Sequence, residues 1–172
     1  MFVRRDLGDL VPTPEGDIHF VKQGSGYPLV MLHPLGTSTW AWHTVIDSLS
    51  QYYTCYAFDM LGHGESDKPT RHFNLPDYAN SLDHACQVLN IHRGHYVGNS
   101  VGACLAIEMA ASYPDRLDKL TLVGCPVWDP RGAPQRLKES DGDYDENGLP
   151  KPRTMAQLKA RTIFANPRRE WL

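Results

Sequence analysis

A single serine between two glycines is the clearest sign of chemistry in this sequence. Gly98-Asn99-Ser100-Val101-Gly102 follows an apolar stretch typical of a buried strand and precedes a stretch typical of a helix. A sharp strand-to-helix turn strains the backbone of the serine, and the glycines let strand and helix pass closely because they lack β-carbons. The hydroxyl would stand where the first amides of the helix favour an anion. The alternative is an ordinary turn in which Ser100 caps the helix.

Two other motifs directly follow apolar runs. His33-Pro34-Leu35-Gly36 comes after the first run, and DMLGHGES, residues 59–66, comes after the second. The glycines of the second motif permit a tight turn beside the site, and Asp59 is expected to stabilise that turn. We therefore expect both loops to support the region around Ser100.

Strands and helices alternate through the first 126 residues. Near-continuous apolar runs predict buried strands near residues 28–33, 53–58, 94–99 and 118–125, and an alternating segment predicts a half-exposed strand at 17–22. Helical spacing or composition predicts helices at 39–51, 75–90 and 100–113. This order predicts an α/β fold with a doubly wound, mostly parallel sheet.

The pattern changes near residue 126. The segment that follows is rich in Pro, Gly and Asp and is typical of a loop, with a short helix expected at 154–164. The sequence therefore predicts a sheet domain over residues 1–126 and a less regular excursion over 127–172.

These motifs, together with YPDRLDKLTLVG, closely resemble those of the α/β-hydrolase family over nearly all of residues 17–126. The branch that the chain resembles most contains ester and lactone hydrolases and the carbon–carbon hydrolases of aromatic ring cleavage. The resemblance implies that Ser100 is the nucleophile that attacks a carbonyl carbon. It also implies that the main-chain N–H groups of Val101 and Leu35 form an oxyanion hole.

Three further residues support the site in this interpretation. Gly98 and Gly102 permit the close turn around the serine. In the family, a histidine at the position of His33 braces its loop by hydrogen bonds. The family commonly has His-Gly where this sequence has His33-Pro34; proline carries no N–H, but the donor position, Leu35, keeps its own.

The order of catalytic residues departs from the family's pattern. The family order is Ser, then Asp or Glu, then His, whereas all eight histidines here precede Ser100. The resemblance therefore implies an N-terminal portion of the fold, truncated before its last strands. Residues 127–172 would be the incomplete start of a cap, and the acid and histidine would lie beyond Leu172. Asp129 is a poor candidate for the acid.

Composition and cysteine spacing exclude several classes of protein. A net charge of −3 gives no basic surface for nucleic acid or anionic membrane, and no apolar run approaches the ~20 residues of a membrane span. The four cysteines lack CxxC spacing and stand mostly in apolar runs: Cys55, Cys86, Cys104 and Cys125. We expect free, buried thiols in a reducing cytoplasm, with no metal site and no cofactor.

Three functions stay open at this point. The first is hydrolysis of a small-molecule ester, lactone or vinylogous ketone through Ser100; a serine nucleophile argues against dehalogenase or epoxide hydrolase chemistry, which uses an aspartate. The second is a non-catalytic ligand-binding module, and the third is an inactive truncated product. The apolar strand at 118–125 would form a sheet edge, which predicts self-association or pairing with a completing chain.

Overall fold

The structure of the chain is a computed structural model, and it describes residues 8–126. Contacts divide the chain into two units, Met1–Pro126 and Val127–Leu172, and every described element belongs to the first. The loop after residue 126, the predicted helix at 154–164, the cap and Asp129 all lie outside the described residues.

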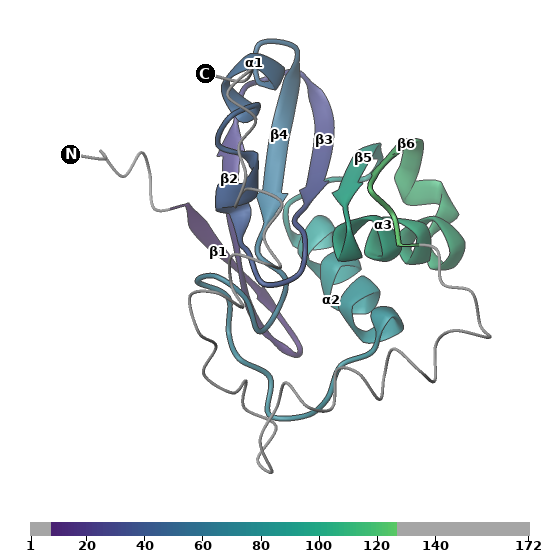
Figure 1. Cartoon of the computed structure of the whole chain (residues 1–172). Coiled ribbons are helices and arrows are strands. Elements are labelled where there is room, and N and C mark those ends of the chain that lie inside the picture. Colours follow the sequence, from purple (N-terminus) through teal and green to yellow (C-terminus); the bar gives the residue numbers. More distant parts are fainter. Residues whose placement is uncertain (1–7, 127–172) are drawn as a thin grey trace, which may run out of the picture. The chain divides into compact units, whose positions relative to one another are not determined.

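The described strands form one mixed sheet in the order β1-β2-β4-β3-β5-β6 (Figure 1). The strands are β1 (Asp9–Thr13), β2 (Gly16–Gln23), β3 (Tyr27–Leu32), β4 (Tyr53–Phe58), β5 (Gly94–Asn99) and β6 (Leu117–Val123). Strands β4, β3, β5 and β6 run parallel, while β2 is antiparallel to both β1 and β4. The prediction of a mostly parallel sheet with four strands at these positions is confirmed.

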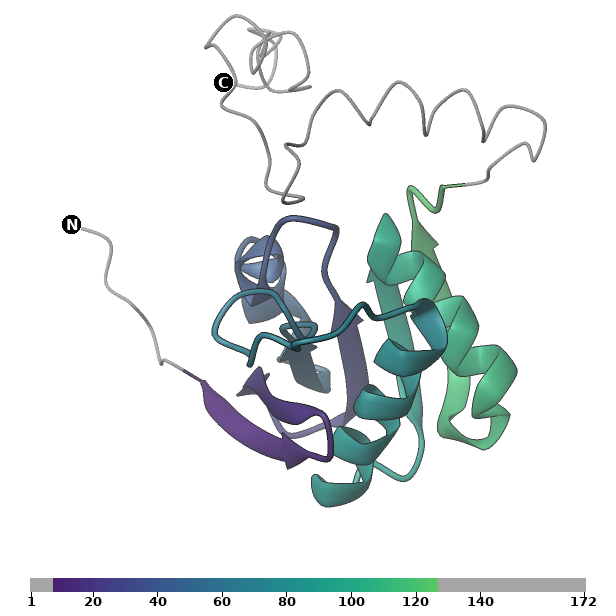
Figure 2. The ribbon, with the colours of Figure 1, turned by 90° about the horizontal axis from the view of Figure 1, so that it is seen from below.

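Two helices, α2 (Leu75–Val88) and α3 (Val101–Ser112), pack side by side. Helix α3 lies along β5 and β6, while α2 packs against α3 and β1 (Figures 1 and 2). Helix α2 begins with a capping box, in which Asn74 Oδ1 accepts the Asp77 N–H and Asp77 Oδ2 accepts the Asn74 N–H. These bonds satisfy two main-chain donors at the start of the helix, and therefore fix where α2 begins.

The side chains of β3 alternate between two cores. Val30 and Leu32 pack in the larger core with α2 and α3, whereas Leu29 and Met31 pack in the smaller one with Trp42 and Ile46. The smaller core is covered by two short elements, η1 (Thr39–Trp42) and α1 (Ile46–Leu49). Successive side chains of a strand point to opposite faces. A strand buried on both faces therefore appears in the sequence as a continuous apolar run.

Two sequence expectations about these elements are wrong. The helix expected at 39–51 is interrupted and forms only η1 and α1. The strand expected to be half-exposed, β2, buries three successive residues, Ile18, His19 and Phe20. Ile18 and Phe20 pack in the larger core, while the loop after β4 covers His19 on the other face through Asp59.

Strand β6 forms one edge of the described sheet. Leu120, Leu122 and Val123 are 37%, 42% and 45% exposed, so the expectation that the strand near 118–125 is buried is also wrong, because β6 has a neighbour on one side only. Self-association through this edge stays a prediction. Among residues 8–126, no helix is both long and apolar enough to cross a membrane.

Candidate active site

Ser100 occupies the turn between β5 and α3 in a strained conformation. Its φ is 55° and its ψ is −117°, a combination outside the regions that non-glycine residues ordinarily adopt. The Ser100 N–H donates to Val123 O at 2.9 Å, which anchors the turn to the end of β6. The Ser100 side chain makes no capping hydrogen bond to α3. The prediction of unusual backbone angles is therefore confirmed, and Ser100 stands at the start of α3 without capping it through its side chain.

Gly98 and Gly102 are required by close backbone approach. A β-carbon on Gly98 would lie 2.2 Å from Gly102 O, and one on Gly102 would lie 2.2 Å from Leu32 O. Both distances are shorter than van der Waals contact with fixed backbone atoms. The two glycines therefore allow α3 to start directly against β5 and β3, which places Ser100 at the carboxyl edge of the sheet.

The loop after β3 reaches the same edge. Leu32 pairs with Gly98 in the parallel ladder, so the segments that follow β3 and β5 leave the sheet side by side. Among the described residues, neither the Leu35 N–H nor the Val101 N–H donates a hydrogen bond. Val101 begins α3, whose dipole favours negative charge at this end. Two segments that leave the same edge of the sheet thus each carry an unused main-chain donor.

His33 joins the loop after β3 to the loop after β4. Its Nδ1–H donates to Pro34 O at 2.8 Å, and its Nε2 accepts the Met60 N–H at 3.0 Å. This pattern requires the neutral ring, and burial accordingly lowers the pKa of His33. Since both ring nitrogens are engaged, His33 positions the loop that carries Leu35 and has no lone pair left to accept a proton from Ser100.

Asp59 holds the loop after β4 together. Its Oδ1 accepts the Thr39 N–H at 2.5 Å, its Oδ2 accepts the Glu65 N–H at 3.0 Å, and His19 Nδ1 lies 2.8 Å from the same Oδ2. A β-carbon on Gly64 would lie 1.9 Å from that Oδ2, so the turn closes directly over the carboxylate. Asp59 therefore stabilises the turn, as predicted. Nothing local in the sequence marks His19 and Thr39 as partners of Asp59.

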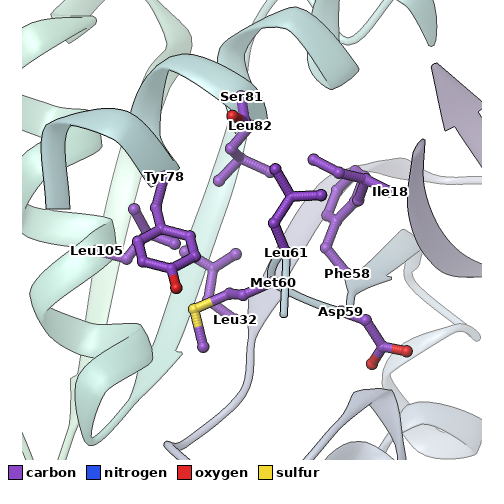
Figure 3. A pocket seen from close by; sticks show the side chains of 10 residues that line it. All are labelled: Ile18, Leu32, Phe58, Asp59, Met60, Leu61, Tyr78, Ser81, Leu82 and Leu105. Atoms are coloured by element: carbon purple, nitrogen blue, oxygen red, sulfur yellow. The ribbon is translucent and has the colours of Figure 1, made fainter. Parts of the chain in front are cut away.

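A small pocket lies beneath this loop and is lined mainly by apolar side chains, including those of Leu32, Met60, Tyr78 and Leu105 (Figure 3). The Asp59 carboxylate points away from it. Its volume of about 10 Å³ corresponds to roughly one water molecule. The pocket is therefore a packing gap between the sheet and α2, too small to hold an organic substrate.

The strain at Ser100 gives a stability prediction. Ser100→Gly is expected to raise the free energy of unfolding by about 1 kcal/mol, because relief of a strained φ/ψ exceeds the entropic cost of glycine. Asn90 is the matched control: its φ is 56°, but asparagine tolerates left-handed backbone well, so Asn90→Gly should gain nothing. Urea unfolding measures both variants. A Ser100→Gly chain that unfolds at lower urea than the parent would contradict the strain.

Comparisons with known proteins agree with this fold. A family model described as alpha/beta hydrolase fold matches residues 27–171. An uncharacterised protein of Mycobacterium tuberculosis is 38% identical over 58% of this chain and 29% of its own length. The 2-hydroxy-6-oxo-2,4-heptadienoate hydrolase of Pseudomonas putida is 33% identical over 71% of this chain and 46% of its own length.

A solved structure shows the same similarity in three dimensions. A meta-cleavage product hydrolase from Pseudomonas fluorescens superposes with a TM-score of 0.63 and 27% identity, over 66% of this chain and 43% of its own. This chain spans less than half the length of each of these three proteins.

Proposed function

This chain belongs to the α/β-hydrolase fold family, and we propose that it contributes a serine nucleophile to hydrolysis of an ester, a lactone or a carbon–carbon bond next to a ketone. The observation that carries the proposal is the backbone of Ser100: φ 55° and ψ −117°, with a side chain that does not cap the helix. A non-glycine residue held in this conformation costs folding energy, and such strain clusters at functional sites.

The geometry of the carboxyl edge supports the roles that we assign. Ser100 Oγ attacks a carbonyl carbon, and the N–H groups of Val101 and Leu35 stabilise the oxyanion that forms. These donors are free among the described residues, as an oxyanion hole requires. His33 and Asp59 act indirectly, since they hold the two loops and touch neither the hydroxyl nor the oxyanion.

The type of bond that we propose is hydrolysed is inferred from the relatives and from the identity of the nucleophile. Two relatives with over 30% identity are 2-hydroxy-6-oxo-2,4-heptadienoate hydrolase and 2-hydroxymuconate semialdehyde hydrolase, and these names support a small-molecule substrate. A soluble epoxide hydrolase is also 31% identical. Serine at position 100 favours acyl-type chemistry over an aspartyl ester, which epoxide opening in this fold uses. The free thiols of the chain support a cytoplasmic location, which we also propose.

Activation of the serine requires a base, and the described histidines do not supply one. His33 uses both ring nitrogens, and no hydrogen bond within residues 8–126 joins a histidine to Ser100 Oγ. Residues 127–172 contain no histidine. A serine hydroxyl without a base is a weak nucleophile. We therefore expect the 172-residue chain to acylate slowly, with any catalysis coming from its oxyanion hole.

Covalent labelling tests the proposal directly. A fluorophosphonate probe should label the 172-residue chain slowly and incompletely, and peptide mass spectrometry should place the adduct on Ser100. Ser100→Ala should abolish the adduct, while Ser48→Ala, which changes an exposed serine of α1, should not.

Other outcomes distinguish the alternatives. No adduct on Ser100 under any condition, with the fold intact, would favour a non-catalytic ligand-binding module. Rapid stoichiometric labelling would show that a base lies within the chain, and His33→Ala and His63→Ala would then identify it, because these two rings lie 5.2 Å apart beside the loops of the site.

A further inference from the structure

Two cysteines converge on the backbone of the Ser100 turn. Cys104 lies one helical turn after Ser100 and donates its N–H to Ser100 O at 3.3 Å. Cys125 lies two residues after Val123, whose carbonyl accepts the Ser100 N–H at 2.9 Å. Gly124, with φ +55°, turns the chain between Val123 and Cys125, directly after β6. The two thiols are close enough for Cys125 to raise the pKa of the Cys104 thiol.

The other two cysteines are in a different environment. Cys55 and Cys86 are 0% exposed, and burial raises the pKa of each thiol to about 11. Cys104 and Cys125 are only partly buried. The expectation of four free thiols is confirmed, whereas the expectation of burial holds for Cys55 and Cys86 alone. The partly accessible thiols are therefore the two beside the Ser100 turn.

We propose that Cys104 and Cys125 are a redox pair that closes reversibly into an intramolecular disulfide beside the Ser100 turn. The oxidant is a small-molecule disulfide such as glutathione disulfide. The thiolate of one cysteine attacks it, forms a mixed disulfide and releases one thiolate. The second cysteine, once deprotonated, attacks the protein sulfur of the mixed disulfide and releases the other. The pair thus loses two electrons and two protons, and the oxidant becomes two thiols.

The surroundings of Cys104 argue against direct catalysis by its thiol. Burial raises the pKa of the Cys104 thiol, and the neighbouring Cys125 raises it further. A catalytic thiol instead needs a lowered pKa, which keeps it as thiolate at neutral pH. Disulfide exchange also proceeds through a thiolate, so the raised pKa slows closure of the pair without preventing it. The reduced pair is the stable form in a reducing compartment.

Closure would fix the end of β6 to the first turn of α3. The hydrogen bond from the Ser100 N–H to Val123 O already joins these segments. A covalent bond between Cys104 and Cys125 would add a second tie and restrict movement of the turn. This effect on the backbone does not depend on whether Ser100 is a nucleophile.

The experiment uses the whole chain, equilibrated in glutathione buffers from fully reduced to fully oxidised and then denatured and labelled with a maleimide. The labels should fall from four to two on oxidation, since the chain has four cysteines. Non-reduced peptide mapping should find Cys104 joined to Cys125, with Cys55 and Cys86 carrying the labels. The oxidised chain should also melt at higher temperature than the reduced one.

Single variants distinguish an internal disulfide from independent reaction of each thiol with glutathione. Cys104→Ser and Cys125→Ser should each accumulate a stable glutathione adduct on the remaining partner, because no second thiol can displace the glutathione. The parent chain should accumulate none. Four labels at every redox ratio, glutathione adducts without the internal disulfide, or a disulfide between two chains would overturn the proposal. Mapping of the parent chain alone decides these outcomes if a variant fails to fold.

Discussion

Gly102→Ala is expected to destabilise the chain by about 3 kcal/mol or more, in a position where alanine would ordinarily stabilise. Gly102 belongs to the first turn of α3, and alanine favours a helix over glycine by about 1 kcal/mol. Its β-carbon, however, would lie 2.2 Å from Leu32 O and 2.6 Å from His33 O. Both are backbone atoms at the end of β3, so no side-chain rotation removes the clash.

The sign of the change in unfolding free energy therefore tests whether α3 starts directly against β3. Gly36→Ala provides the control: φ at Gly36 is +73°, yet nothing lies within 4 Å of an added β-carbon. That variant should lose only about 1 kcal/mol, the cost of left-handed backbone. Urea unfolding measures both changes. A Gly102→Ala chain as stable as the parent would mean that α3 does not start against β3, and the position assigned to Ser100 would be wrong.

The strained turn could be predicted from the sequence because the residues that form it are close together in the chain. Ser100 and its two glycines lie within five residues, and the adjoining apolar runs have the patterns expected of a strand and a helix. Buried parallel strands such as β3 and β4 could be predicted equally well. Helical elements cover both faces of these strands, so each appears in the sequence as a continuous apolar run.

The elements that sequence reasoning missed are short or locally ambiguous. Strand β1 contains Pro12 and buries only Val11, so it lacks the apolar pattern of a strand; its pairing with β2 defines it. Proline is tolerated there because β1 is an edge strand. The segment between η1 and α1 includes Thr44 and Val45, whose β-branched side chains weaken a continuous helix.

The support of the site depends on contacts between distant residues. His19 and Asp59 are 40 residues apart, and Thr39 and Asp59 are 20 apart. The alternation around His19 indicated a half-exposed strand, and no local signal marked this histidine as buried beside a carboxylate. Likewise, the contact between Cys104 and Cys125 follows from the pairing of β5 with β6 and from the start of α3, not from cysteine spacing.

Leu35→Pro is expected to slow the acylation of Ser100 and any hydrolysis of p-nitrophenyl acetate by about 10²–10³-fold, the usual effect of losing one oxyanion donor. The substitution removes the N–H that the proposal assigns to the oxyanion hole and changes little else. Leu35 is 68% exposed, and Gly36 has the φ of +73° found at the third position of a type II turn. Proline is favoured at the second position of that turn, which Leu35 occupies.

The matched control for this prediction is Leu35→Ala, which shortens the same exposed side chain but keeps the N–H. It should react at nearly the parent rate, so the ratio between the two variants isolates one donor. Circular dichroism and thermal melting should show both chains folded to the same degree, because His33 and Thr37 hold the preceding carbonyl of Pro34 in each. Equal rates for the proline and alanine variants would exclude the Leu35 N–H as a donor. Val101 would then be left as the only assigned donor, and a loop closing differently over Ser100 would have to supply the second.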